Sequence, residues 1–372
     1  MTSAKAWSRW ALRCSRIEPA GLCAGRRHLR TAAIILSIAL VSCQAPSEQA
    51  PSSSRFSGPT MGTRYTVEVL LDEVSSRRFV ELKDVVEAVL DDVNLKMSNY
   101  VEDSEVSRLN RWTDPDPFEV SADTLEVLQH ASEISATTGG AFDITVAPLV
   151  SAWGFGPPGR PPEQPTNDEI EQLRVLTGWE KLRVDRGTSS VTKAHPDLTV
   201  DLSAIAKGFG VDRVADALDA EGVENYMVEV GGEVRTRGLN LQGESWRIGI
   251  ERPVPGEQAI DLIVPLLGGL AMATSGDYRN YYEAEGRRIS HTIDPRTGFP
   301  ITHNVASVSV IASLCVRADA YATGLLVLGP EGFDLAEELG LAAYFLQRDK
   351  EGFFVGRMTT AFKEILESGN RD

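Results

Sequence analysis

Hydrophobic residues recur along this chain of 372 residues with two different spacings. Apolar side chains at every second position over 64–70 predict a half-buried strand, and apolar side chains three and four positions apart over 79–97 predict an amphipathic helix. A second helix is expected from Ser121, a favourable N-cap, to the Gly139-Gly140 pair. Helical spacing also predicts helices over 204–218, 316–328, 330–339 and 359–366. Strand-like runs occupy 181–184, 190–193, 198–202, 226–230, 246–250, 270–274, 289–293, 305–311, 343–347 and 353–356.

These helices and strands are mixed along the chain without strict alternation. A doubly wound parallel sheet requires a helical crossover between successive strands, and many of these strands follow one another directly. The order therefore favours an α+β fold with mixed, largely antiparallel sheets flanked by helices. Because no internal repeat and no second linker interrupts the pattern, we expect a single domain over 56–368.

The N-terminal segment has the pattern of an export signal. Three arginines within 26–30 precede the apolar run 32–41, which is too short to span a bilayer and ends in Leu-Val-Ser-Cys at Cys43. This order resembles the lipobox of bacterial lipoproteins, although an ordinary secretory signal or a buried strand would also contain such a run. We expect a signal peptide over 1–42 and a flexible tether over 43–55. The mature protein would then face the periplasm, held at a bacterial membrane by a lipid on Cys43.

Charge and cysteine content narrow the possible partners. The formal net charge is −16, and loss of residues 1–42 removes seven basic residues and one acid, which leaves −22. Nucleic acid is therefore not expected as a partner. Besides Cys43, the mature chain contains only Cys315, so no intrachain disulfide is expected. Cys315 follows an apolar run and is interpreted as a small buried side chain, in preference to a catalytic thiol.

Five glycine clusters lie beside polar residues. Glycine lets backbone N–H groups approach a phosphate or a ring closely, although each cluster alone is typical of an ordinary turn. Together they favour a nucleotide-sized ligand, while the lack of a Gly-x-Gly-x-x-Gly or Walker sequence excludes a dinucleotide site of the Rossmann kind and a P-loop. The clusters are Met61-Gly62-Thr63, Thr138-Gly139-Gly140-Ala141-Phe142-Asp143, Gly231-Gly232-Glu233, Ser275-Gly276-Asp277 and Asp294-Pro295-Arg296-Thr297-Gly298.

Three positions could carry phosphate chemistry. Asp319 and Thr323 are four apart on one face of a predicted helix, where they offer hard oxygen ligands to Mg²⁺. A surface acid with a helix-interior threonine is the plainer interpretation of that spacing. Lys207 begins the predicted helix after 198–202 and could contact phosphate, or it could be an ordinary solvated lysine. His291 ends a strand before a Pro/Gly turn, which suits a proton acceptor.

These segments, in this order, resemble the ApbE family of FAD:protein FMN transferases. The resemblance extends from about residue 58 to residue 330 and implies the ApbE fold. The segments that carry it are Met61-Gly62-Thr63-Arg64-Tyr65, Met97-Ser98-Asn99-Tyr100 with Asp103-Ser104-Glu105, GGAFDITVAPL from Gly139, VDLSAIAKGFG from Val200, Val228-Glu229-Val230-Gly231-Gly232, Thr274-Ser275-Gly276-Asp277-Tyr278, SHTIDPRTG from Ser290 and ADAYATG from Ala318.

The resemblance implies a role for particular residues of this chain. His291 would act at the phosphoryl centre. The backbone carbonyl of Ala204 would join Asp319 and Thr323 in binding Mg²⁺, or else Ca²⁺ or Mn²⁺. Some members carry a further acid where this chain has Ala322, so a smaller metal shell is expected. The residues implied in the FAD site are Met61, Tyr100, Ala141, Phe142, Asp143, Asp201 and Lys207.

The expected reaction follows from the same resemblance. A threonine or serine hydroxyl of a target flavoprotein, such as a membrane respiratory subunit, would attack the FMN phosphorus of FAD and release AMP. A metal-dependent FAD pyrophosphatase would use the same residues with water as the acceptor. A flavin-binding lipoprotein without enzymatic activity is the third possibility.

Overall fold

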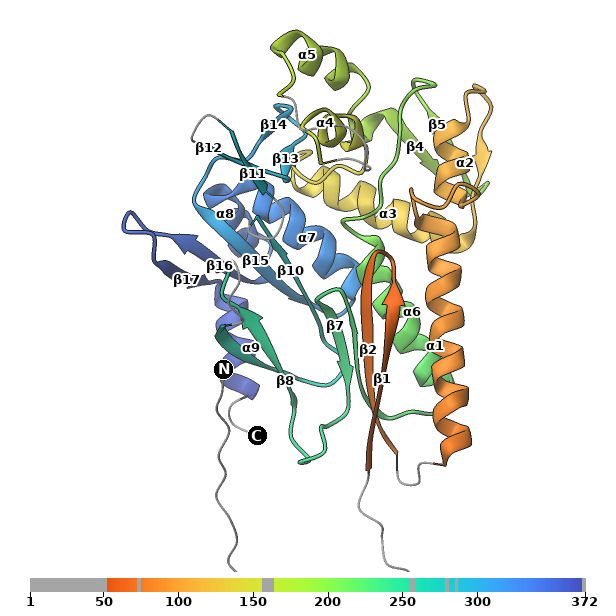
Figure 1. The fold of residues 1–372 in the computed structure, drawn as a ribbon, viewed down its shortest axis with the longest axis vertical. Helices are drawn as coiled ribbons and strands as arrows, with labels where there is room; N and C mark the ends of the chain where they lie inside the picture. Colours follow the sequence, from red (N-terminus) through yellow and green to blue (C-terminus); the bar gives the residue numbers. More distant parts are fainter. Residues whose placement is uncertain are drawn as a thin grey trace, which may run out of the picture. The chain divides into compact units, whose positions relative to one another are not determined.

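An antiparallel sheet of eight strands runs through the part of the chain that the structure describes (Figure 1). The structure is a computed structural model that describes residues 52–71, 75–155, 164–254, 259–277, 281–284 and 287–369. In spatial order the strands are β1 (Ser52–Thr60), β2 (Thr63–Leu71), β6 (Asn225–Val230), β7 (Glu233–Arg237), β10 (Ala271–Gly276), β15 (Val305–Ala312), β16 (Ala342–Arg348) and β17 (Phe354–Met358). Hairpins and longer returns join them, so every pair is antiparallel.

Shorter strands form small sheets around this one. β8 (Trp246–Glu251) pairs with β9 (Ile260–Leu266), and β11 (Tyr281–Ala284) pairs with β12 (Arg287–Ser290). The remaining strands are β13 (Ile293–Asp294) with β14 (Phe299–Pro300), and β3 (Phe118–Glu119), β5 (Ser190–Lys193) and β4 (Leu182–Asp185) in that order. The expected α+β class with largely antiparallel sheets is confirmed.

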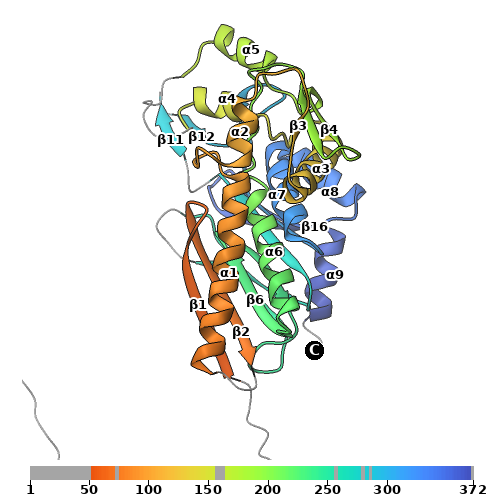
Figure 2. The same cartoon turned by 90° about the vertical axis from the view of Figure 1, so that its right-hand side faces the viewer.

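Helices cover one face of the large sheet. α1 (Ser76–Met97), α6 (Ala206–Ala220) and α7 (Cys315–Leu328) lie against it, as Figures 1 and 2 show from two sides. The opposite face packs on β8, β9 and α9 (Thr360–Gly369). The other helices are α2 (Glu105–Arg111), α3 (Ala122–Thr137), α4 (Ala147–Ala152), α5 (Asn167–Val175), α8 (Pro330–Glu338) and the single 3-10 turn η1 (Trp179–Lys181).

Successive side chains of β10 point to opposite faces of the sheet, and each face packs in a different hydrophobic core. Ala271 and Ala273 face the helices, whereas Met272 between them packs on the β8–β9 side. Apolar residues on both faces of a central strand are expected when both faces are covered. The helix α7 is buried along most of its length, as its hydrophobic C-terminal half predicted, and Cys315 at its first position is buried too.

Most predicted elements are confirmed within a few residues, but the strand expected over 198–202 is wrong. Its alternating side chains Leu198, Val200 and Leu202 are buried, yet the segment has no strand partner. The Val200 N–H donates instead to the side chain of Asn110, at 2.7 Å, and Asn110 donates back to the Val200 carbonyl. Here the alternating apolar residues belong to a buried segment that is not a strand. A side chain far away in the sequence forms hydrogen bonds with its backbone N–H and carbonyl groups.

Two further boundaries differ from expectation. The strand predicted over 289–293 is divided between β12 and β13, with a bend at His291. β1 begins at Ser52, inside the range expected for the tether, so residues 52–55 pair with β2. The signal peptide, Cys43 and the tether before Ser52 lie outside the described residues. No helix in the described ranges is both long and apolar enough to cross a membrane.

Candidate active site

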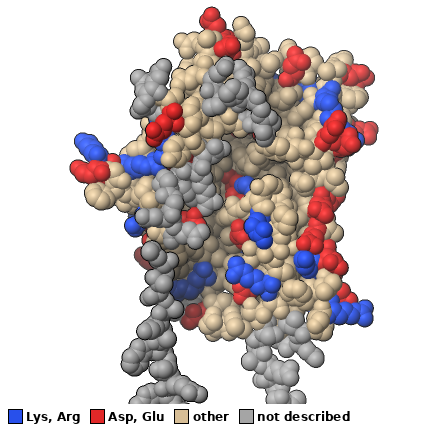
Figure 3. All heavy atoms as spheres, in the orientation of Figure 1, with Lys and Arg blue, Asp and Glu red and all other residues tan. Residues whose placement is uncertain are grey.

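A cavity of about 690 Å³ lies between the N-terminal part of α6, α7 and the strands β7, β8 and β10. Pockets of this size, with apolar walls and a few polar groups, are typical of small-molecule sites. Met227, Ile248 and Met272 contribute apolar wall, while His291 and Pro295 lie at another part of the lining. Lys and Arg are interspersed with Asp and Glu on the face drawn in Figure 3, which shows no continuous basic stripe.

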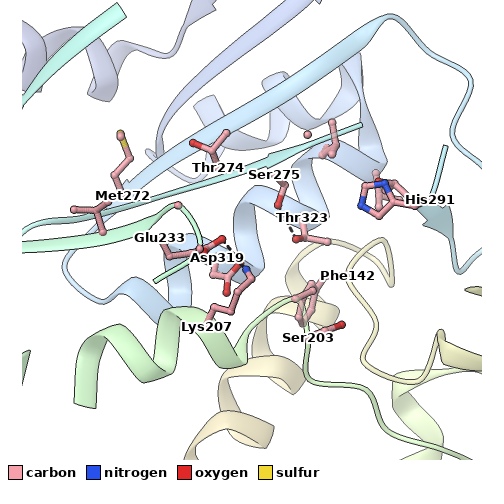
Figure 4. Close-up of a pocket in the computed structure, with 18 of the residues that line it drawn as sticks. Phe142, Ser203, Lys207, Glu233, Met272, Thr274, Ser275, His291, Asp319 and Thr323 are labelled. Atoms are coloured by element: carbon pink, nitrogen blue, oxygen red, sulfur yellow. Dashed lines mark hydrogen bonds and ion pairs between the residues drawn. The ribbon is translucent and has the colours of Figure 1, made fainter. Parts of the chain in front are cut away.

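The polar wall of the cavity is built on three charged side chains. Lys207, at the start of α6, places its Nζ 2.7 Å from Glu233 Oε1 and 3.7 Å from Asp319 Oδ1. Glu233 begins β7 and Asp319 lies in α7, so three different elements meet here (Figure 4). Glu233 and Asp319 are almost fully buried, whereas the Lys207 side chain remains 26% exposed. All three residues line the cavity, and the lysine is the most exposed of them.

Burial and charge act in opposite directions on this group. Burial alone would lower the pKa of Lys207, but the neighbouring carboxylates of Asp319 and Glu233 outweigh it and raise that pKa. Burial raises the pKa of Glu233 to about 8, although Lys207 opposes the shift. Lys207 therefore carries its positive charge throughout the neutral range.

Close packing of α6 on α7 holds Asp319 in place. The Gly208 N–H donates to Asp319 Oδ2 at 3.0 Å. A Cβ at position 208 would lie 2.4 Å from the Cys315 carbonyl oxygen and 2.9 Å from Asp319 Cβ, so only glycine permits this approach. The Lys-Gly pair in the predicted VDLSAIAKGFG segment thus supplies both the cation and the space for the carboxylate.

The diversion of the Gly208 N–H has a consequence for Ala204. In a regular helix this N–H would donate to the carbonyl four residues earlier, which belongs to Ala204. Among the described residues no hydrogen bond reaches the Ala204 carbonyl, although Ala204 lines the cavity. The Ala204 carbonyl, for which the family resemblance implies a role in metal binding, is therefore not occupied by this N–H.

Thr323 lies one turn beyond Asp319 on α7 and also lines the cavity. Its hydroxyl is 2.8 Å from that of Ser275 on β10, so the two oxygens form a pair facing the site (Figure 4). Gly324 permits α7 to approach the 138–142 loop, because a Cβ there would lie 3.0 Å from Thr138 Cγ2 and 3.1 Å from Phe142 Cβ. Asp319 and Thr323 are thus brought to one cavity as predicted.

The predicted loop residues Ala141, Phe142 and Asp143 form a further part of the lining. The Asp143 carboxylate is occupied, since it accepts hydrogen bonds from Thr145 and from the Trp179 N–H at 2.9 Å. Burial nevertheless raises its pKa, despite the Thr145 and Trp179 hydrogen bonds and the charge of Lys181. Asp143 therefore shapes the loop, and its carboxylate is already engaged within the protein.

Asp201 ties this loop to the start of α6. Its N–H donates to the Ile144 carbonyl at 2.7 Å, and its carboxylate accepts from the Ser203 N–H at 2.9 Å. These two bonds fix the turn that presents Ala204 and Lys207 to the cavity. Asp201 itself lines the cavity, as expected.

His291 lines the cavity from the bend between β12 and β13. Its ring packs edge-on against Phe155, with ring centroids 6.2 Å apart. Figure 4 shows it apart from the Lys207 group, beyond Ser275 and Thr323. The bend places the imidazole at the cavity. In a continuous strand, its direction would have been fixed by the alternation of side chains between the two faces.

Two of the predicted FAD residues do not line this cavity. Met61 occupies the two-residue turn between β1 and β2, and packs against the hydrophobic cores beside α6. Tyr100 lies after α1 and is 77% exposed. Their predicted contact with FAD stays a prediction, and in Tyr100 it would require the ligand or a partner to cover an open side chain.

Glu233 and Ser275 are polar residues of the wall that the sequence placed in glycine clusters but to which it assigned no role of their own. Glu233 stands directly after the Gly231-Gly232 turn, and both glycines have positive φ, as a two-residue hairpin turn requires. An acid directly after such a turn, in a segment already suspected of binding a ligand, is the signal that could have identified it. No cluster of three or more His, Cys, Asp or Glu suited to a metal occurs in the described ranges.

The chain as a whole is similar to known proteins. A family model described as the ApbE family matches residues 61–345. The FAD:protein FMN transferase of Haemophilus influenzae is 42% identical over 341 residues, covering 90% of this chain and 97% of the relative. That of Vibrio cholerae is 45% identical, covering 84% of this chain and 92% of the relative.

Solved structures agree with the sequence comparison. The flavin transferase ApbE from Vibrio cholerae superposes with a TM-score of 0.77 at 42% identity, covering 84% of this chain and 99% of that one. The apo flavinyl transferase ApbE of Pseudomonas stutzeri gives the same TM-score and identity, covering 85% of this chain and 97% of that one.

Proposed function

This chain belongs to the ApbE family, and we propose that it is an enzyme that transfers the FMN part of FAD to a threonine or serine hydroxyl of a target flavoprotein. The observation that carries the proposal is the cavity in which Lys207, Asp319 and Thr323 meet the loop of Ala141 and Phe142. A cationic side chain beside hydroxyl and carbonyl oxygens suits a diphosphate, and the apolar walls suit the rings at its two ends.

The oxygens of this wall fit a divalent cation, which we propose to be Mg²⁺, with Ca²⁺ or Mn²⁺ as substitutes. The Ala204 carbonyl has no hydrogen bond among the described residues, and Asp319 and Thr323 add a carboxylate and a hydroxyl on adjacent turns of α7. Hard oxygen ligands of this kind suit Mg²⁺, which keeps several waters or phosphate oxygens for the rest of its shell. When bound, such an ion neutralises charge on the phosphates.

His291 and Lys207 then have separate roles in the reaction. The target hydroxyl attacks the phosphorus on the FMN side, and the bond between that phosphorus and the bridging oxygen of AMP breaks. His291 accepts the proton of the attacking hydroxyl. Lys207 donates to the phosphate oxygens, on which charge increases as AMP leaves. The apolar wall excludes water from the site, which favours the protein hydroxyl over water as the acceptor.

One experiment separates this function from its two alternatives. The purified protein is incubated with FAD, Mg²⁺ and a candidate target flavoprotein, and the products are identified by mass spectrometry. The proposal predicts AMP together with a target that carries covalent FMN. Free FMN formed equally well without a target would indicate a pyrophosphatase, and FAD that stays intact would indicate a flavin-binding protein without activity. A His291→Ala variant is the control, and it should form neither product at the wild-type rate.

We also propose that the protein is exported and carries a lipid on Cys43, which would keep it beside membrane targets such as respiratory flavoprotein subunits. The support is the basic, apolar and small-residue pattern that ends at this cysteine. Mass spectrometry of the N-terminal peptide from bacterial membranes should detect a diacylglyceryl group on Cys43. A soluble product cleaved elsewhere would contradict the anchor without affecting the proposed reaction.

A further inference from the structure

Glu233 has an arrangement that stability alone does not explain. Its side chain is 4% exposed, and one oxygen, Oε2, is buried without a hydrogen-bond partner among the described residues. Leaving a carboxylate oxygen buried and unpaired costs stability, so a residue kept in this state calls for another explanation. In the described ranges, the side chain that forms a hydrogen bond and an ion pair with the Glu233 carboxylate is Lys207.

The distances show what that contact does to Lys207. The ammonium is 2.7 Å from Glu233 Oε1 but 3.7 Å from Asp319 Oδ1. Lysine carries its charge on a flexible stem, so without an acceptor at position 233 the ammonium is free to move onto Asp319. Asp319 is the residue whose carboxylate would bind the cation of the proposed function. A lysine paired closely with it would compete with that cation for the same oxygens.

The backbone of the hairpin fixes Glu233 behind the lysine. The β6–β7 turn uses Gly231 and Gly232, and a Cβ at position 231 would lie 3.3 Å from Lys207 Cδ and 2.9 Å from Thr63 Cγ2. The turn therefore packs directly on the stem of Lys207. Because Glu233 follows this turn directly, its carboxylate reaches the ammonium beside that of Asp319, as Figure 4 shows, and it is the nearer of the two.

We propose that Glu233 is a positioning residue, which holds the Lys207 ammonium by a hydrogen bond and so keeps the Asp319 carboxylate available for a divalent cation. The inference rests on the proposed function. Glu233 is part of the cavity lining, and in this role its carboxylate acts on the cation through Lys207. The role requires a hydrogen-bond acceptor at position 233, which a glutamine also provides and a methionine does not.

The test measures cation binding in the absence of FAD, so that it does not depend on turnover. Mg²⁺ and Mn²⁺ are titrated calorimetrically into the purified full-length protein and its variants. Glu233→Met should weaken binding on the order of 10- to 100-fold, the range usual for groups that orient a metal ligand. Glu233→Gln should retain most of the affinity, which also controls for loss of folding.

The decisive comparison repeats Glu233→Met in a Lys207→Met background. If Glu233 acts through Lys207, Glu233→Met should change cation affinity by no more than about twofold in this background. A twofold change is about the precision with which the effects of two substitutions can be compared. An equal loss in both backgrounds would overturn the inference, because Glu233 would then act on the cation directly or through the fold. Unchanged affinity in Glu233→Met alone would overturn it as well.

Glu229 provides a matched control on the same hairpin. It lines the cavity, but its carboxylate accepts from the Gly232 N–H at 2.8 Å and makes no contact with Lys207 in the described structure. Glu229→Met should weaken binding by less than about threefold through screened charge alone. A loss as large as that of Glu233→Met would count against the inference.

The same titration separates failure of the inference from failure of the proposed function. If the wild type binds neither ion, or if Asp319→Asn binds them as well as the wild type, the metal assignment itself is wrong. If Asp319→Asn abolishes binding while Glu233→Met has no effect, only the role of Glu233 is wrong.

Discussion

Two groups of charged residues join the same three elements, α6, α7 and β7, and they differ in how completely their polar atoms are paired. In the first, Asp212 of α6 accepts from Arg235 of β7 at 2.7 Å and from the Cys315 and Val316 N–H groups at the start of α7. Both oxygens of Asp212 are used. In the second, Lys207, Glu233 and Asp319 leave Glu233 Oε2 without a partner and the lysine partly exposed.

This difference separates a structural group from a functional one. α7 has no side-chain cap of its own, and Asp212 supplies it from the neighbouring helix, where a negative charge at a helix N-terminus is favourable. The second group has unused hydrogen-bonding capacity at the cavity wall, and that capacity is what a ligand requires. Substitutions in the first group should therefore affect mainly the free energy of unfolding, and substitutions in the second should affect mainly catalysis.

The largest effect on stability is expected from Asp212→Ala. This change leaves the half-buried Arg235 with only the more distant Asp216, at 3.9 Å, and removes the acceptor for two N–H groups of α7. Breaking one side of a buried ion pair costs about 3–5 kcal/mol. Urea unfolding should show that loss, and activity should fall in proportion to the unfolded fraction. If unfolding were unchanged while activity disappeared, the distinction between the two groups would be wrong.

Asp319→Asn should produce the opposite pattern. The asparagine keeps the shape and one acceptor for the Gly208 N–H, but it loses the charge that a divalent cation requires. FMN transfer should fall by on the order of 100-fold, since a metal supplies several kcal/mol to such a step. The melting temperature should change little beside that of Asp212→Ala. Full activity of Asp319→Asn at saturating Mg²⁺ would rule out the metal role.

Gly208→Ala tests the contact on which both groups depend. A Cβ at position 208 would lie 2.4 Å from the Cys315 carbonyl, so α6 and α7 must separate. Overpacking of this kind costs about 1–3 kcal/mol, less the gain in helix propensity. Both the free energy of unfolding and transfer activity should fall, measured by urea unfolding and AMP release. Gly210→Ala in the same helix is the control without crowding, since the nearest atom to a Cβ there, Met61 Sδ, lies 3.5 Å away.

The two groups also show what could be predicted from the sequence. Helix α7 and its pair Asp319 and Thr323 follow from local spacing, because residues four apart share a helix face whatever surrounds them. The roles of Glu233 and Asp212 depend on which elements pack together, and local spacing contains no information about that. The strand prediction over 198–202 was wrong for the same reason, because Asn110, the side chain that binds the Val200 backbone, is 90 residues away.

The smallest change, taken per pH unit, is expected in the pH dependence of stability without metal, to which both groups contribute because burial raises the pKa of Asp212 as well as that of Glu233. Burial raises the pKa of Glu233 to about 8, from an ordinary value near 4.5. The folded state then binds a proton that the unfolded state has released, so the stabilisation is complete below pH 4.5 and is lost as the pH rises through 8. One such proton gives a slope of at most about 1.4 kcal/mol per pH unit. Urea unfolding of the wild type between pH 5 and 8 should show this decline, and Glu233→Gln should reduce it while the share of Asp212 remains. An equal decline in Glu233→Gln and the wild type would mean that Glu233 contributes none of it, and its unpaired oxygen would then not set it apart from the fully paired Asp212.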